Sequence, residues 1–408
     1  MAGGANLASW ITTHRVRVHG TLLALCLWSL YSWNMATPGL RDRAGNLKGT
    51  DFLHLYTLGS LALAHRGADL YNMQAQTVLS AQRVPAAVGI RYLPLYPPQV
   101  SIFLAPFAQF SYGGALVLWL VLSAGIYASC VYAVWRACPA LRNELRAVWI
   151  LALAFPAFWH LILWGQTSAL ALAGFTLGYL ALRNDRGFLA GLAFGCLIFK
   201  PQLGIAAAVI FLATGGWKVI AGGLLSAAAQ LAAAWAYYGL GTLREWILTL
   251  FRLPGLFPLL EPKPYQTHCL RSFWTMLLPW PRIAAGPYIV TVLLALVLAA
   301  RCWNSRISLP LRYSALLLAT VLVAPHLTVY DLVILGPAFL LLADWCIANF
   351  DDSTSPSLKI LLYAAYALPL VGPLARWTHV QLTVPVMFLI LYLISQIGRR
   401  SAHSAATA

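Results

Sequence analysis

The sequence predicts an all-α protein in which about 12 helices cross a membrane as one polytopic bundle. Hydrophobic residues make up 61% of the 408 residues and charged residues only 9%, a composition outside the range of soluble globular proteins. Apolar runs long enough to cross a hydrocarbon core recur from one end of the chain to the other. Because a chain in lipid must satisfy its own backbone hydrogen bonds, these runs must be helices.

The first predicted span is uncleaved, because Arg15 and Arg17 precede an apolar run that no convincing signal-peptidase site follows. All spans belong to one integral membrane domain, residues 1–408, whose cytoplasmic tail, residues 399–408, is expected to be disordered. In chain order, the predicted spans cover residues 19–37, 113–135, 147–164, 168–182, 187–199, 201–215, 219–238, 284–300, 313–326, 330–347, 359–374 and 380–397.

The basic residues between the spans predict which side of the membrane each loop faces. Loops rich in arginine and lysine stay in the cytoplasm, which places both termini inside and the long connections outside. We therefore expect a protein of the inner (plasma) membrane with its site on the periplasmic or extracellular face. The residues that share the cytoplasmic side are Arg15, Arg17, Arg136, Arg142, Arg146, Arg183, Arg186, Lys218, Arg301, Arg306, Arg312, Lys359, Arg399 and Arg400.

The formal net charge of +16 follows from this topology, since the basic residues are scattered over the loops. A positive field that attracts substrate is the alternative explanation. No basic run lies inside a soluble domain, so we expect membrane lipids and no nucleic acid as partners. The seven cysteines show no metal-type spacing, and only Cys269 is predicted to lie in an outer loop, so no disulfide framework is expected.

Two long connections are predicted on the outer side. The first, residues 38–112, contains DFLHLYTLGSLALAH (51–65), which is typical of an amphipathic, interfacial helix lying on the membrane. It also contains VSIFLAPFAQF (100–110), which is too short to cross and forms either a second surface helix or a re-entrant piece. The second connection, residues 239–283, is rich in proline, aromatic and basic residues and is a possible lid.

A short helical hairpin at residues 187–215 carries a lysine at its tip. Each arm of about 13 residues is roughly 20 Å long, short of a hydrocarbon core of about 30 Å. The tip therefore lies below the outer surface, and Lys200 is predicted to face a water-filled cavity, because a lysine in lipid is costly. A Lys200 side chain that reaches the headgroups is the structural alternative. Pro201 suits the first position of the second arm.

Polar residues gather at the outer ends of the predicted spans, although they lie far apart in the sequence. One pocket lined from several spans is the economical explanation. The outer acids are Asp42, Asp51, Asp69, Glu245, Glu261 and Asp331, and the polar motifs are TDF (50–52), ADLY (68–71), YPPQ (96–99), WGQTS (164–168), FKPQLG (199–204), QTHCLRS (266–272) and APHLTVYD (324–331).

Each of these residues also has a purely structural interpretation. Asp51 suits the N-cap of the helix that follows it, and Gln166 with Thr167 suits a helix end next to a cap. The other structural interpretations are a turn at Asp69, a rigid corner at Tyr96, Pro97 and Pro98, a satisfied helix-end histidine at His326, and ordinary loop positions at His268 and Arg271.

At these motifs the chain resembles glycosyltransferase family 87, membrane-embedded enzymes of the GT-C class that use polyprenyl-phosphate sugars, typically polyprenyl-phosphate mannose. The resemblance covers roughly residues 20 to 345 and lies in DFLHLY, GADLY, YLPLYPPQ, WGQTSAL, IFKPQLG and APHLTVYDL. The segment QTHCLRSFW departs from the Asn-x-Ser-like pattern that relatives often carry there, so acceptor-side details are not carried over.

The resemblance implies that Asp51 is the catalytic base of an inverting transfer of one sugar, mannose above all. Such a transfer needs one base for the acceptor hydroxyl, and fixed donors and cations for the leaving phosphate, but no second carboxylic acid. It implies neither a cofactor nor a metal. The implied contacts to donor phosphate or sugar are Lys200, Gln202, His326 and Gln166; Tyr96, Gln99 and Tyr330 line the pocket, and His268 and Arg271 lie on a lid over it.

The expected partners are therefore a polyprenyl-phosphate sugar and a glycolipid or glycan acceptor of the cell envelope. Two other functions stay open at this point. A flippase or transporter for lipid-linked sugars would place polar residues through the midplane on paired broken helices, which the sequence does not indicate. A ligase that transfers a whole glycan from a lipid carrier would use similar chemistry and differs in the size of its donor.

Overall fold

The computed structural model of the chain describes residues 7–261 and 263–407. Every named element within these residues is an α-helix or a 3-10 helix, as the composition predicts. Two isolated β-bridges, Arg41 with Leu47 and Thr267 with Thr328, join loop segments. The all-α prediction is confirmed for this part of the chain.

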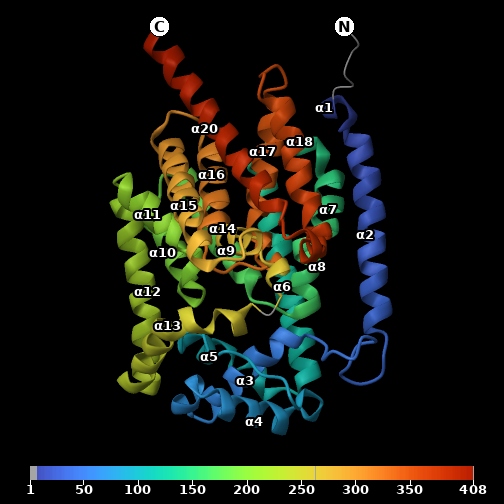
Figure 1. Ribbon diagram of the computed structural model, residues 1–408, viewed down its shortest axis with the longest axis vertical. Helices are drawn as coiled ribbons and strands as arrows, with labels where there is room; N and C mark the ends of the chain where they lie inside the picture. Colours follow the sequence, from blue (N-terminus) through green and yellow to red (C-terminus); the bar gives the residue numbers. More distant parts are fainter. Residues whose placement is uncertain (1–6, 262, 408) are drawn as a thin grey trace.

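The apolar runs that were predicted as spans form an upright bundle of helices (Figure 1). Its members are α2 (Thr13–Met35), α6 (Tyr112–Trp135), α7 (Leu145–Ala154), α8 (Pro156–Trp164), α9 (Ser168–Arg183), α10 (Gly187–Gly195), α11 (Ile205–Ala213), α12 (Trp217–Tyr238), α15 (Pro281–Asn304), α16 (Leu309–Val323), α17 (Gly336–Ala348), α18 (Ser355–Ala367) and α20 (Thr383–Thr407). Short 3-10 turns extend some of them, including η5 (Cys196–Phe199), η6 (Pro201–Leu203), η8 (Val329–Leu335) and η9 (Leu368–Leu374), with α19 (Ala375–Thr378) after η9.

Fewer helices are long and apolar enough to cross a membrane than the sequence predicts. Among the described residues there are five, or six if the bent pair α7–α8 counts as one span. The count of about 12 is thus not confirmed, because helices such as α9 (16 residues) and α16 (15 residues) fall short of the roughly 20 residues that a span needs. The five are Tyr112–Trp135, Trp217–Tyr238, Pro281–Asn304, Val329–Ala348 and Ser355–Thr378.

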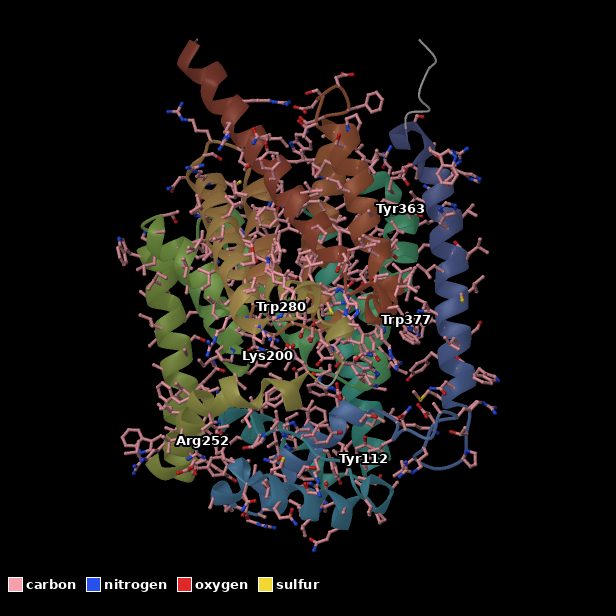
Figure 2. All side chains as sticks on the ribbon, viewed as in Figure 1. Tyr112, Lys200, Arg252, Trp280, Tyr363 and Trp377 are labelled. Carbon is pink, nitrogen blue, oxygen red and sulfur yellow. The ribbon has the colours of Figure 1, made fainter. Side chains whose placement is uncertain are left out.

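The bundle has two different ends. Helix α1 (Leu7–Trp10) and the C-terminal part of α20 lie at one end, and α3 (Thr50–Leu63), α4 (Met73–Arg83) and α5 (Gln99–Leu104) form a layer across the other (Figure 1). Lys200 lies between the upright helices and this layer (Figure 2). Helix α20 also includes most of the segment that the sequence predicts to be a disordered tail.

Helix α3 differs from the surface helix that was expected. All residues from Phe52 to Ala62 are buried, beneath α4, α5 and the 3-10 turn η3 (Phe107–Gln109). Gly59 allows the closest approach, because a Cβ there would lie 2.5 Å from the Leu104 carbonyl oxygen. The polar residues of α3, His54, Thr57 and Ser60, are buried together with its apolar ones, so the helix lies inside the protein.

The second connection contains α13 (Leu240–Leu260), η7 (Pro264–Gln266) and α14 (Leu270–Leu277). The face of α13 that packs on the first connection is partly polar, and Trp246 donates a hydrogen bond of 3.2 Å to the Leu95 carbonyl. The exposed residues of α13 include Leu240, Ile247 and Phe251. The helix therefore packs on the first connection and leaves large apolar side chains at the surface.

The short hairpin α10–α11 is held against α12 by glycines. A Cβ on Gly191 would lie 2.1 Å from the Val219 carbonyl oxygen, and one on Gly222 would lie 2.2 Å from that of Phe188. Small residues let two helix backbones touch, which fixes the hairpin tip in depth. Lys200 is held at that tip, between η5 and η6.

Candidate active site

The turn before α3 positions Asp51. Gly49 occupies the N-cap position with φ +63°, a left-handed conformation that suits glycine, and Asp51 follows in the first helical turn. Tyr112 donates hydrogen bonds of 2.7 and 2.8 Å to the carbonyls of Lys48 and Gly49. Tyr92 donates to the Thr50 carbonyl. Asp51 is thus held at the start of a buried helix by two tyrosines.

The Asp51 carboxylate points away from its own helix. Its Oδ2 accepts a hydrogen bond of 2.7 Å from Gln166 Nε2, and its side chain makes no cap bond to α3. The interpretation of Asp51 as an N-cap is therefore wrong, since that position belongs to Gly49. The other Asp51 oxygen accepts no hydrogen bond from the residues that the structure describes. A carboxylate with one oxygen in reserve can receive a proton.

Burial raises the pKa of Asp51 from 3.8 to about 6. The hydrogen bond from Gln166 and the charge of Lys200 act in the opposite direction, because both favour the ionised form. Asp51 is therefore a stronger base than an exposed aspartate and is still ionised at neutral pH. Such tuning is typical of groups that take part in proton transfer.

Gln166 connects Asp51 to the upright helices. It follows Gly165, which ends α8 with φ +69° and whose carbonyl accepts a hydrogen bond of 2.9 Å from Trp119. Its Nε2 also donates to the Tyr330 hydroxyl at 3.1 Å. The Tyr96 hydroxyl lies 3.5 Å from Gln166 Oε1. One amide thus joins three other residues that the sequence predicts for the pocket.

A buried ion pair lies beside this group. Lys200 Nζ is 2.7 Å from Asp331 Oδ1, and both side chains are more than nine-tenths buried. Ser168 donates a 2.5 Å hydrogen bond to the same oxygen and accepts one of 3.2 Å from Lys200. The backbone amide of Thr328 donates to Asp331 Oδ2 at 3.3 Å in a capping box. Lys200 is therefore paired with a carboxylate, where the sequence predicts a water-filled cavity.

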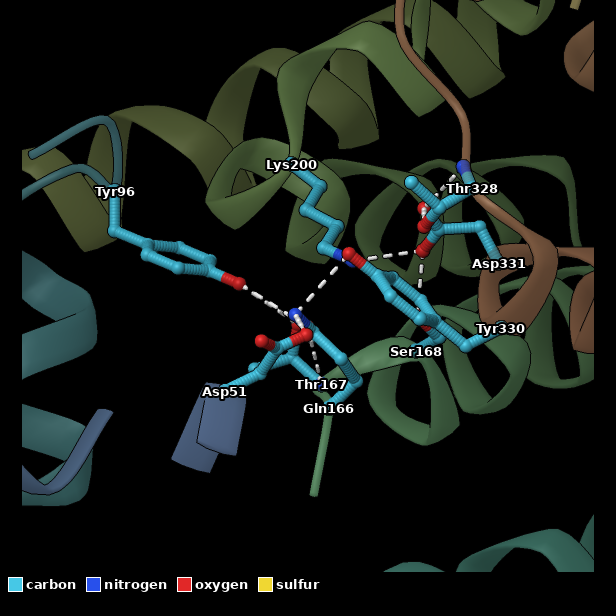
Figure 3. Close-up of polar contacts among 9 residues, drawn as sticks. All are labelled: Asp51, Tyr96, Gln166, Thr167, Ser168, Lys200, Thr328, Tyr330 and Asp331. Atoms are coloured by element: carbon cyan, nitrogen blue, oxygen red, sulfur yellow. Dashed lines mark hydrogen bonds and ion pairs between the residues drawn. The ribbon is translucent and has the colours of Figure 1, made fainter. Parts of the chain in front are cut away.

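The residues around Gln166 and the Lys200–Asp331 ion pair form one polar centre, drawn in Figure 3. Of the predicted residues it contains Asp51, Tyr96, Gln166, Lys200 and Tyr330, and Lys200 Nζ lies 5.1 Å from the centre of the Tyr330 ring. The centre also contains three residues for which no role was predicted, Ser168, Thr328 and Asp331. The sequence does carry a signal for Asp331, because it is a rare carboxylate in the APHLTVYD motif, directly after Tyr330.

The remaining predicted residues lie outside this centre. His268 is buried, and its Nδ1 lies 2.7 Å from the Thr383 hydroxyl of α20. Gln99 has both amide atoms buried without a hydrogen-bond partner in the described part of the chain. Gln202 follows Lys200 at the hairpin tip, in η6, and is half-buried.

Arg271 and His326 form a second cluster with Glu261, an acid for which no role was predicted. Glu261 pairs with Arg271, and Glu261 Oε1 lies 2.6 Å from His326 Nδ1. Arg271 also donates a 2.5 Å hydrogen bond to the Pro325 carbonyl. Two residues predicted for the donor site and its lid are thus brought together, through Glu261.

The upright apolar helices and the buried polar centre together define the class: a helical membrane protein with a polar site. Comparison with protein families defines the class more narrowly, because the model of glycosyltransferase family 87 matches residues 95–329, more than half of the chain. The chain belongs to this family and is therefore a glycosyltransferase. The match includes Gln166, Lys200 and His326 but begins after Asp51. No curated protein and no solved structure matches the chain.

Proposed function

We propose that this glycosyltransferase moves one sugar, mannose, from a polyprenyl-phosphate donor to an acceptor hydroxyl with inversion, and that Asp51 is the general base. The observation that supports this most is the state of Asp51: a carboxylate whose pKa burial raises to about 6, with one oxygen bonded to Gln166 and the other accepting no hydrogen bond from the described residues. A base in an inverting transfer needs this free oxygen.

In the proposed reaction, the acceptor oxygen attacks the anomeric carbon while its proton passes to Asp51. The bond between the anomeric carbon and the phosphate oxygen breaks, and its electron pair leaves with the polyprenyl phosphate. No second acid is needed, because a phosphate leaves readily when positive groups stabilise its charge. Lys200 is the nearest buried cation to Asp51 in the polar centre, and Gln202 follows it two residues later.

The proposed location is a plasma or inner membrane, with the α3–α5 layer on the outer side and both termini in the cytoplasm. The positive-inside distribution of the loops supports this orientation. The presence of α1 and the C-terminal part of α20 at the end opposite the α3–α5 layer is compatible with it (Figure 1). The acceptor is a glycolipid or glycan that reaches this layer.

The test is transfer by the purified protein in lipid nanodiscs, with short-chain polyprenyl-phosphate mannose as donor. We expect the wild-type protein to form a mannosylated acceptor, Asp51→Asn to abolish this product, and Asp69→Asn to leave it unchanged. Asp69 is the matched control, an acid of the same connection whose carboxylate pairs with Arg66 at 2.7 Å.

Full transfer by a folded Asp51→Asn protein would overturn the base assignment. Flux of lipid-linked sugar across vesicles without a glycosyl product would replace the proposal by a transporter. Use of a diphosphate-linked glycan, with no use of the monosaccharide donor, would identify a ligase.

A further inference from the structure

The second connection is fastened to the segment that leads into the polar centre. The His268 amide donates a 2.9 Å hydrogen bond to the Leu327 carbonyl, and Thr267 forms a β-bridge with Thr328. Arg271 donates to the Pro325 carbonyl at 2.5 Å. Residues 267–271 and 325–328 therefore form one docked unit next to Asp331.

The Glu261 side chain lies buried against this unit. It is 6% exposed, against 16% for Arg271 and 17% for His326, its two partners. Its carboxylate uses one oxygen for each partner. Burial acts to raise the pKa of Glu261, but His326 and Arg271 outweigh it and hold this pKa below its usual range. Glu261 is therefore an ionised group that bridges two donors.

A gain in folding stability does not by itself explain why Glu261, Arg271 and His326 are buried together. Burying a carboxylate and a guanidinium costs so much hydration that apolar residues of the same size often serve as well or better. The cluster does, however, have the composition of a phosphate site. Arginine binds phosphate oxygens in the same forked geometry as a carboxylate, and histidine adds a further donor. A phosphodiester and a glutamate thus compete for the same donors.

The place of the cluster links it to the reaction. His326 precedes Thr328 by two residues, and Thr328 holds Asp331, the partner of Lys200. An anion bound between Arg271 and His326 would therefore lie on the segment that carries the Lys200 ion pair. The donor phosphate is the anion that the proposed function requires near this centre.

We propose that Arg271 and His326 form the seat of the donor phosphate, and that Glu261 occupies this seat until the donor displaces it. This inference rests on the proposed function and adds to it an internal competitor. A protein whose binding site is filled by its own side chain binds ligand more weakly, in proportion to the fraction of time that the site is open. Removal of the Glu261 charge should increase that fraction.

The experiment measures binding of a short-chain polyprenyl phosphate without sugar to the full-length protein in phosphatidylcholine nanodiscs. Glu261→Gln keeps the shape and an acceptor oxygen but removes the charge, and we expect it to lower the Kd about ten-fold. Glu245→Gln is the matched control, an exposed acid of α13 with the same charge change, and should not alter the Kd. An unchanged or weaker affinity of a folded Glu261→Gln protein would overturn the inference.

A second pair of variants decides the question if Glu261→Gln does not fold. Arg271→Gln should weaken binding of the polyprenyl phosphate, Arg271→Lys should restore most of it, and Arg252→Gln, an exposed control on α13, should have no effect. Equal binding by all three would contradict the seat. Because the probe carries no sugar, the two hypotheses fail separately. If the enzyme is active but the Glu261 and Arg271 variants bind polyprenyl phosphate as the wild type does, only the phosphate seat is contradicted. If the wild-type protein neither binds polyprenyl phosphate nor transfers sugar, the proposed function is contradicted.

Discussion

Two carboxylates of the polar centre differ in almost every contact. Asp331 accepts hydrogen bonds from Lys200, Ser168 and Thr328, and its charge is neutralised. Asp51 accepts one hydrogen bond, from the neutral amide of Gln166, and burial raises its pKa to about 6. Residue type alone therefore does not reveal a role. A saturated carboxylate holds a structure in place, and one that is short of partners is available to a proton.

The largest expected effect separates the two acids by activity. Asp51→Asn should lower turnover about one hundred- to ten-thousand-fold, because the reaction loses its base. Because the pKa of Asp51 is higher in the folded protein, about 6 against 3.8, its ionisation lowers the free energy of unfolding as the pH rises through this range. The variant should therefore unfold at pH 7 no earlier than the wild-type protein. A drop in melting temperature alongside lost turnover would show that Asp51 also stabilises the fold, as Asp331 does.

Asp331 should show the opposite pattern, with stability lost first. Asp331→Asn leaves Lys200 buried without its counter-ion, which should lower the free energy of unfolding by about 3–5 kcal/mol. The double variant Lys200→Met with Asp331→Leu should recover most of this loss without recovering turnover, as thermal unfolding and transfer assays in nanodiscs would show. A stable Asp331→Asn protein would contradict the structural role of the ion pair.

Gln166 sets the acidity of Asp51 and so provides a sharper test. We expect the acid side of the wild-type pH–rate profile to have its midpoint near pH 6, with activity lost as Asp51 is protonated. Gln166→Leu removes a hydrogen bond to the ionised form, so the midpoint should rise by about one pH unit. Gln109→Leu, at an exposed position of the first connection, is the control. An unchanged midpoint would show that protonation of Asp51 does not cause the loss of activity at low pH.

The smallest effect is expected at Thr328. Its capping box supports Asp331 from the backbone side, so Thr328→Val should cost about 1 kcal/mol of the free energy of unfolding, and Thr328→Ser should cost less. Transfer should change little, since Lys200 and Ser168 still hold Asp331. Melting temperatures of the two variants measure this directly, and a loss as large as that of Asp331→Asn would show that the cap, and not Lys200, holds the carboxylate.

The sequence predicted the helices and much of the polar centre for a physical reason. Apolar runs in lipid must be helical, and polar residues at one end of several spans were expected to share a pocket. Asp51, Gln166, Lys200 and Tyr330 do lie in one centre, whereas Arg271 and His326 lie in a separate cluster. The partner of Lys200 was not predictable, because Asp331 lies far along the chain and nothing local distinguishes pairing from an open cavity.

Three other features were not predictable from local sequence. Helix α3 was expected on the membrane surface because its sequence is typical of an amphipathic helix, yet α4 and α5 cover it and bury Phe52 to Ala62, polar residues included. His268 was expected on a lid, but it is buried against Thr383 of the last upright helix, a contact across 115 positions that no sequence pattern records. The span count is not confirmed, because apolar composition does not reveal whether a helix reaches both surfaces.

The starting points of the helices around the polar centre have one more consequence. Helices α3 and α9 begin at Thr50 and Ser168, beside Asp51 and Lys200. Free backbone amides give the first turn of a helix a partial positive charge, which attracts anions within that turn. This attraction belongs to the main chain and has no protonation equilibrium. On the proposed function, a variant without Lys200 would still offer the donor phosphate a weakly positive background that no side-chain substitution removes.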